Sequence, residues 1–199
     1  MIGDDTPAKV DDELLDRVLI GGRERQTIVI VDYDPGWPRR FEQEREKIAQ
    51  ALGLRAQFIE HIGSTSVPGL DAKPIVDILV TVDEAEIEDD ERLVADLEAA
   101  GYELRVREPE HRMFRTPARD VHIHVFANDS DEIERYILLR DRLRRSTEDR
   151  VLYAETKRKL ATREWSDMNY YAEAKTDVIQ AILARAREDR ERGSSDQQR

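Results

Sequence analysis

The sequence contains no cysteine among its 199 residues. This absence excludes disulfide bonds, catalysis by a thiolate and zinc sites built on sulfur ligands. Any bound metal ion must therefore be held by histidine, aspartate or glutamate side chains.

Long apolar stretches are also missing, since no segment approaches the roughly 20 apolar residues that span a bilayer. The first ten residues are acidic, whereas a secretory signal begins with basic residues and continues with apolar ones. We therefore expect a cytoplasmic protein without a membrane partner.

Lysine is scarce, because six lysines stand against 26 arginines and 44 acidic residues. The formal net charge of -12 disfavours unaided binding to a phosphate backbone, so we expect no nucleic-acid partner. A lysine-poor acidic surface also fits adaptation to salt, and an arginine-rich, GC-rich genome is the alternative explanation. A melting temperature that does not rise in molar salt would count against adaptation to salt.

The length predicts one domain with a single substantial core. An amphipathic run over residues 9–20 predicts a short helix, so we assign residues 1–25 to a partly disordered helical extension. The β-branched run Thr27–Asp32 predicts the first strand of a domain over residues 26–190. We assign residues 191–199 to a disordered tail.

The remaining pattern predicts alternating strands and helices, followed by helices alone. A helix from Pro38 to Leu52 ends at Gly53, and the last three strands should form an antiparallel meander. This order predicts an α+β fold with helices against one side of a mixed sheet. The other expected strands are 57–62, 75–82, 102–106, 111–115 and 121–126, and the other helices are 91–100, 132–145, 148–163 and 167–190.

A glycine and serine turn precedes a strand that carries a lone carboxylate. Gly63 allows backbone N–H groups to approach a phosphate, and the Ser64 hydroxyl adds a neutral donor. Asp77 could hold a divalent cation against the phosphate oxygens. Thr65 extends the polar loop, and Lys73 could add a point charge. The alternative is an ordinary loop beside a structural aspartate.

Two histidines lie two residues apart on a predicted strand, so the side chains of His122 and His124 share one face. With Asp77, and with His61 as a possible fourth ligand, they form a candidate metal site. Imidazole ligands suit zinc, manganese, nickel or iron better than magnesium. The alternative is that the histidines hydrogen-bond the loop and the acid without a metal.

Arginine side chains could complete an anion pocket, because the guanidinium group donates two parallel hydrogen bonds to a phosphate. Arg115 lies on the predicted strand beside the two histidines, and Arg140 lies on the helix that follows. In a chain so rich in arginine, most such residues are solvated surface.

Four separated segments resemble the GrpB family, which belongs to the nucleotidyltransferase-like superfamily. They are residues 33–37 (YDPGW), 61–70 (HIGSTSVPGL), 73–78 (KPIVDI) and 122–124 (HIH), and the resemblance covers residues 27–187. It implies a nucleotidyltransferase-like mixed sheet with a C-terminal helical segment. It also implies that Lys157, Tyr171 and Lys175 are further, weaker candidates for the anion pocket.

Ile62, Gly63 and Ser64 match the first half of the nucleotidyltransferase signature, and Asp77 matches its first acid. Leu79 stands where the second acid belongs, and the two histidines stand where a later strand supplies the third carboxylate. The resemblance implies Ser64 and Asp77 as catalytic residues, a divalent metal (magnesium, manganese or zinc) and a nucleotide or phosphate ligand.

Two functions follow from this resemblance. The first is metal-assisted transfer of a nucleotidyl or phosphoryl group to an acceptor. The second is a non-catalytic module that binds a nucleotide or phosphate in coenzyme metabolism, since GrpB domains also occur fused to dephospho-CoA kinases. Leu79 favours the second, because two bridging carboxylates normally hold two catalytic cations.

Overall fold

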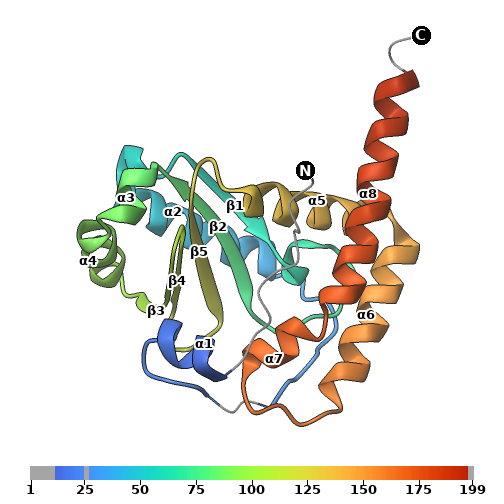
Figure 1. The fold of residues 1–199 in the computed structure, drawn as a ribbon, viewed down its shortest axis with the longest axis horizontal. Helices are drawn as coiled ribbons and strands as arrows, with labels where there is room; N and C mark the ends of the chain where they lie inside the picture. Colours follow the sequence, from blue (N-terminus) through green and yellow to red (C-terminus); the bar gives the residue numbers. More distant parts are fainter. Residues whose placement is uncertain (1–11, 25–26, 197–199) are drawn as a thin grey trace.

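The computed structural model describes residues 12–24 and 27–196 of the chain, with side chains as far as Arg192. A mixed five-stranded sheet in the order β1-β2-β5-β4-β3 forms its centre (Figure 1). Its strands are β1 (Phe58–Ile62), β2 (Val76–Val82), β3 (Glu103–Glu108), β4 (His111–Arg115) and β5 (Val121–Ala127). Only β2 and β5 pair in parallel, and β3, β4 and β5 form the predicted antiparallel meander.

Helices precede, interrupt and follow the strands in sequence and pack on the sheet, which confirms the predicted α+β fold. They are α1 (Asp12–Val18), α2 (Trp37–Leu52), α3 (Glu84–Glu88), α4 (Glu91–Ala99), α5 (Asp131–Arg145), α6 (Thr147–Ala161), α7 (Met168–Glu173) and α8 (Thr176–Asp196). No helix in the described residues combines the length and apolar character needed to cross a bilayer.

Both faces of the sheet carry helices, so the prediction of helices on one side was wrong. Side chains that alternate along β2 point to opposite faces. Ile78 and Val80 belong to the main core with α2 and α4. Leu79, in contrast, packs beneath α5 on the other face, in a cluster that includes Tyr136. Because α5 covers only part of this second face, a site can form beside it.

The run Thr27–Asp32 does not join the sheet, and the prediction of a first strand there was wrong. Val31 makes a single antiparallel bridge with Ala72. Ile28 instead packs against Leu160 of α6 and Tyr171 of α7. Ile28 and Ile30 therefore find apolar partners on these helices, whereas Val29 is exposed and Val31 packs against the main core.

The predicted last helix is interrupted, and α7 and α8 meet at Ala174 and Lys175. The Asp167 side chain caps α7 by accepting a hydrogen bond of 2.9 Å from the backbone N–H of Asn169. Helix α8 continues to Asp196, beyond residue 190 where the sequence predicted its end. Residues 1–11 and 197–199, also assigned to the flexible ends, lie outside the described residues.

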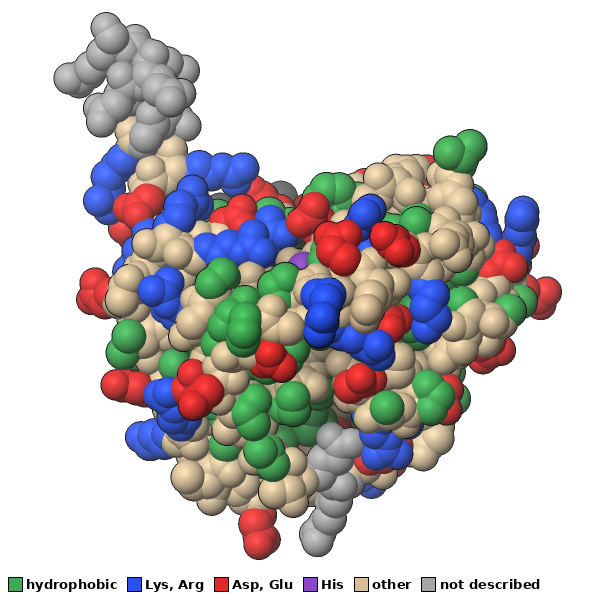
Figure 2. Space-filling view, turned by 180° about the vertical axis from the view of Figure 1, so that it is seen from behind, with side chains coloured by type: hydrophobic (Ala, Val, Ile, Leu, Met, Phe, Trp, Pro, Cys, Tyr) green, Lys and Arg blue, Asp and Glu red, His purple; other side chains and the backbone are tan. Residues whose placement is uncertain are grey.

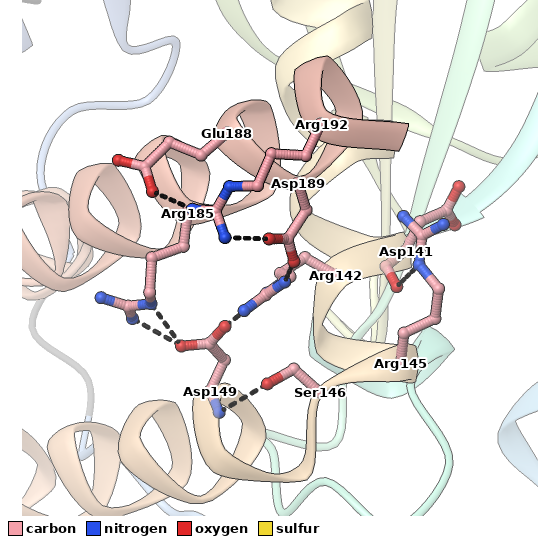
Figure 3. A network of polar contacts seen from close by, with 9 residues as sticks. All are labelled: Asp141, Arg142, Arg145, Ser146, Asp149, Arg185, Glu188, Asp189 and Arg192. Carbon is pink, nitrogen blue, oxygen red and sulfur yellow. Dashed lines mark hydrogen bonds and ion pairs between the residues drawn. The ribbon is translucent and has the colours of Figure 1, made fainter. Parts of the chain in front are cut away.

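A buried carboxylate joins the three long C-terminal helices (Figure 3). Asp149 of α6 is 2 % exposed and accepts hydrogen bonds from Arg142 of α5 (2.5 Å) and Arg185 of α8 (2.9 Å to Nε). Its backbone N–H is capped by the Ser146 hydroxyl at 3.2 Å. This network holds α6 and α8 beside the sheet, where Figure 1 shows them side by side.

Candidate functional site

Asp77 lies on β2, on the sheet face that α5 covers in part. Its register partner on the parallel strand β5 is His122, and His124 is the partner of Leu79. Because strand residues two apart share a face, all of these side chains point to the same side. The parallel pairing of β2 and β5 thus brings together residues that are 45 positions apart in the sequence.

Asp77, His122 and His124 form a cluster with the dimensions of a metal site. His122 Nδ1 lies 3.6 Å and His124 Nε2 lies 3.8 Å from Asp77 Oδ1. One ligand atom from each residue can be chosen so that all lie within 4.8 Å of one another, and all three side chains are partly buried. Burial raises the pKa of Asp77, but the two imidazole groups lower it by more when they are protonated, so its carboxylate ionises readily.

Gly63 brings the polar turn directly against this carboxylate. Its φ angle is +66°, a conformation that glycine adopts without strain. A Cβ atom at residue 63 would collide with Asp77 Oδ2 and lie 3.0 Å from Asp77 Cγ. The next residue, Ser64, begins a short 3-10 turn (η2, Ser64–Ser66). Glycine is therefore required at this position for the turn and the acid to meet.

Most of the predicted site residues line one cavity of about 390 Å³. Those that line it are Gly63, Ser64, Lys73, Asp77, Arg115, His122, His124 and Arg140. Thr65 lies outside this lining and is 1 % exposed. Its hydroxyl is hydrogen-bonded to His61 Nε2 at 3.0 Å.

His61 lies on the other face of the sheet from Asp77. It pairs in register with Ile78 and stacks on Phe41 of α2, with ring centroids 4.9 Å apart. Burial lowers the pKa of His61 to about 4, so its ring is neutral at physiological pH. This position separates His61 from the metal cluster.

Three lysines converge on the cavity from separate elements. Lys73 precedes β2, Lys157 lies on α6, and Lys175 lies at the junction of α7 and α8. Lys157 Nζ donates a hydrogen bond of 2.9 Å to the Ser64 hydroxyl. Burial, together with the neighbouring Lys175, lowers the pKa of Lys157 to about 7 and that of Lys73 to about 8.

From the sequence, Lys157 and Lys175 are weaker candidates than Arg140. The signal that could have found them is the scarcity of lysine, because half of the six lysines in this arginine-rich chain face one cavity. Two of the lysines also make cation–π contacts with tyrosine rings. Lys157 Nζ lies 4.9 Å from the ring centre of Tyr153, and Lys175 Nζ lies 4.9 Å from that of Tyr171.

The two predicted phosphate-binding arginines already have acidic partners. Arg115 forms two hydrogen bonds of 3.0 Å with the carboxylate of Glu24. Arg140 donates to Glu60 at 2.6 Å and to Asp141 at 2.8 Å. The positive charge of these arginines is therefore largely offset by their acidic partners, and the charge of the lysines is offset less. Elsewhere, acidic and basic side chains are interspersed over the face seen in Figure 2.

Leu79 cannot contribute to the cavity. It is fully buried and packs with Ile62, Phe126 and the apolar side chains of α5, which include Ile133. A carboxylate at this position would enter an apolar cluster. Leu79, which stands where the signature has its second acid, is therefore part of the apolar packing beneath α5.

The mixed sheet, the Gly63-Ser64 turn and the carboxylate on the following strand define an α+β domain with a polar turn held against an acid. The chain belongs to the GrpB protein family, whose model matches residues 27–185. The family resemblance seen in the sequence is thereby confirmed.

Individual relatives agree with this assignment. A UPF0157 protein of Streptomyces coelicolor is 52% identical over 168 residues, which cover 84% of this chain and 89% of that protein. The crystal structure of the conserved protein GrpB from Enterococcus faecalis is similar, with a TM-score of 0.70 and 33% identity over 79% of this chain and 96% of that one. A shorter match, 37% identical over 81 residues, is to a dephospho-CoA kinase of Mycolicibacterium paratuberculosis and covers 39% of this chain and 19% of that enzyme.

Proposed function

We propose that the cavity binds a nucleotide through its phosphates and that the protein transfers a nucleotidyl or phosphoryl group with the help of a divalent cation. The observation that carries this proposal is the contact of the Gly63-Ser64 turn with Asp77 in the wall of a cavity that three lysines also line. A hydroxyl, ammonium groups and a metal-binding carboxylate are the groups that stabilise negative charge on phosphate oxygens.

The donor set fits a divalent cation. Asp77, His122 and His124 supply one carboxylate and two imidazole groups within 4.8 Å of one another, and this mixture suits zinc better than magnesium. When bound, the cation would polarise a phosphoryl oxygen and offset its charge. The remaining roles belong to Ser64 and Lys157, which are joined at 2.9 Å and would contact the same phosphate.

Tyr171 adds independent support for a ligand. Its hydroxyl group is buried and has no hydrogen-bond partner among the described residues, although nearly all buried polar groups in proteins have one. Tyr171 also lines the cavity. A polar ligand in the cavity would provide the missing partner.

A nucleotide- or phosphate-binding module without catalysis is the second candidate, and the burial of Leu79 favours it. With one carboxylate at the metal cluster, the site lacks the second acid that bridges two cations in two-metal transfer. The local match to a dephospho-CoA kinase agrees with a role beside coenzyme metabolism.

One experiment separates the two candidates. The purified chain is incubated with each labelled nucleoside triphosphate and with magnesium, manganese or zinc, and nucleotide binding and the released product are measured. Nucleotidyl transfer predicts pyrophosphate, phosphoryl transfer predicts a nucleoside diphosphate, and either product should disappear in Asp77→Asn. Binding without turnover supports the module, and absence of nucleotide binding by the wild type overturns both.

A further inference from the structure

A line of hydrogen bonds extends from His124 away from Asp77. His124 Nδ1 lies 3.2 Å from His111 Nε2, and His111 Nδ1 lies 2.8 Å from Glu108 Oε2. The three residues come from β5, β4 and β3, so the line crosses three neighbouring strands. The other ring nitrogen of His124, Nε2, is the one that faces Asp77.

The chemistry of the groups determines the direction of these hydrogen bonds. The Glu108 carboxylate can only accept, so His111 Nδ1 must donate to it. A neutral His111 then has a lone pair on Nε2, which accepts the hydrogen bond from Nδ1–H of His124. A neutral His124 with its proton on Nδ1 presents the Nε2 lone pair to the side of Asp77. The cluster thus offers a lone pair and a carboxylate to the same point.

We propose that Glu108 and His111 are positioning residues of the metal site, which hold His124 in the Nδ1–H tautomer and thereby make the site select zinc over magnesium. This inference rests on the proposed metal site at Asp77. Histidines that bind metals commonly donate their other N–H to a carboxylate or another acceptor, and such partners fix the ring and increase its basicity. Here an imidazole relays the effect of the carboxylate.

Packing holds the relay in place. The His111 ring is stacked on Phe126, with centroids 4.4 Å apart and planes 12° apart. The planes of His111 and His124 differ by only 6°. The rings therefore have little freedom to rotate, and their nitrogen atoms remain aligned. A role limited to packing would require the flat rings but not the direction of the hydrogen bonds.

Two variants separate positioning from packing. His111→Phe keeps a ring that can stack on Phe126 and removes both nitrogen atoms. Glu108→Gln keeps the size of the side chain but removes the obligatory acceptor, because an amide can also donate. Glu98→Gln, at an exposed position on α4 across the sheet, is the control for loss of one negative charge.

The first measurement is metal affinity, with zinc alone and magnesium alone as probes, by calorimetry or chelator competition. We expect zinc affinity to fall roughly 10- to 100-fold in Glu108→Gln and His111→Phe, as for other residues that support a metal ligand. Magnesium affinity and the melting temperature should change little, and Glu98→Gln should match the wild type. Unchanged zinc affinity in both variants overturns the inference.

The second measurement needs no metal. The chain has four histidines, so long-range ¹H–¹⁵N spectra can identify the protonated nitrogen of each neutral ring. The metal-free wild type should show His124 protonated at Nδ1, and the two variants should shift it toward Nε2–H. A wild-type His124 protonated at Nε2 overturns the inference.

Asp77→Asn and His124→Ala test the underlying site separately. If they abolish zinc binding while Glu108→Gln and His111→Phe do not weaken it, the metal site stands and the positioning role fails. If the wild type does not bind zinc, or if Asp77→Asn and His124→Ala bind it normally, the proposed metal site itself is wrong and the selection of zinc fails with it.

Discussion

Gly63 and Asp77 approach so closely that any side chain at residue 63 would collide with the carboxylate. Gly63 lies between the last residue of β1 and the turn. Asp77 lies near the start of β2, the antiparallel neighbour of β1. The contact places a flexible, donor-rich backbone beside the only acid of the metal cluster.

Gly63→Ala should therefore damage the site beyond the cost of backbone strain. The strain of a positive φ is about 1–3 kcal/mol for a residue other than glycine. Gly69 in the same loop has a φ of +75° and open space where a Cβ would lie, so Gly69→Ala isolates the strain. Zinc and nucleotide affinity should fall in Gly63→Ala and persist in Gly69→Ala. Equal affinities in the two variants would contradict the importance of the contact.

Lys157 should make the binding of an anionic ligand depend on pH. Its pKa of about 7 in the free protein would rise next to a phosphate, so binding takes up a proton. Affinity should be highest below pH 7 and decrease as the pH rises to 9, because the free ammonium group is then deprotonated. Titrations of a nucleotide between pH 6 and 9 measure this slope.

The matched variants for this prediction lie on the same helix. Lys157→Met should lower affinity and flatten the slope, whereas Lys159→Met removes an exposed charge and should do neither. The stability effect has the opposite sign: because burial lowers the pKa of Lys157 below its unfolded value of about 10.4, its charge opposes folding increasingly as the pH falls from about 10 to 7. Lys157→Met should remove that component.

Tyr171→Phe should separate ligand binding from stability. Its hydroxyl is buried without a hydrogen-bond partner among the described residues, so its removal should cost little or stabilise the protein. If the ligand supplies the partner, affinity should fall by about 0.5–1.5 kcal/mol, the net value of one hydrogen bond. Tyr102→Phe is the contrast, because that hydroxyl donates to buried Glu44 at 2.5 Å and its loss should destabilise the fold. Denaturant unfolding and calorimetry report the two effects.

Leu79→Asp should not restore a second catalytic acid. The side chain is fully buried beneath α5, so the carboxylate would lose hydration without gaining a metal. We expect a loss of several kcal/mol in the free energy of unfolding or failure to fold. Leu79→Asn, which has nearly the same shape, should lose less at pH 7, and the difference should shrink at acidic pH. Urea unfolding at pH 5 and 7 tests this, and a stable Leu79→Asp variant with increased transfer activity would refute it.

Asp149 should control the acid stability of the C-terminal helices. Burial opposes ionisation, but Arg185 and Arg142 outweigh it and lower the pKa of Asp149 in the folded state. Its contribution is therefore present above the unfolded value of about 3.9 and is lost as the pH falls below it. Asp149→Ala should cost about 1–3 kcal/mol at pH 7, because the partly buried Arg142 and Arg185 lose a charged hydrogen-bond partner.

The control for Asp149 is an exposed acid of α8. Glu188 pairs with Arg192 at 3.0 Å on the surface, and Glu188→Gln should change the free energy of unfolding by less than about 1 kcal/mol. Unfolding curves at pH 7 and pH 3 should show that the difference between wild type and Asp149→Ala decreases in acid. A constant difference would contradict the electrostatic origin.

Much of the fold could be predicted because the local patterns are strong. The apolar run in β2 and the alternating pattern of β4 and β5 predicted those strands to within about one residue. Thr27–Asp32 has the composition of a strand, but Ile28 and Ile30 pack against α6 and α7 instead of joining the sheet. Such choices between partners depend on distant segments, which local patterns cannot contain.

The sequence by itself determined the parts of the site that are close together along the chain: a glycine, a hydroxyl and a carboxylate on either side of one loop, and two histidines on one face of one strand. Only the tertiary structure decided that His61 faces away, that Leu79 is sealed under α5, and that Glu108 and His111 support His124. The physical reason is that strand pairing and helix packing set distances between residues far apart in sequence. Those distances decide which polar groups meet.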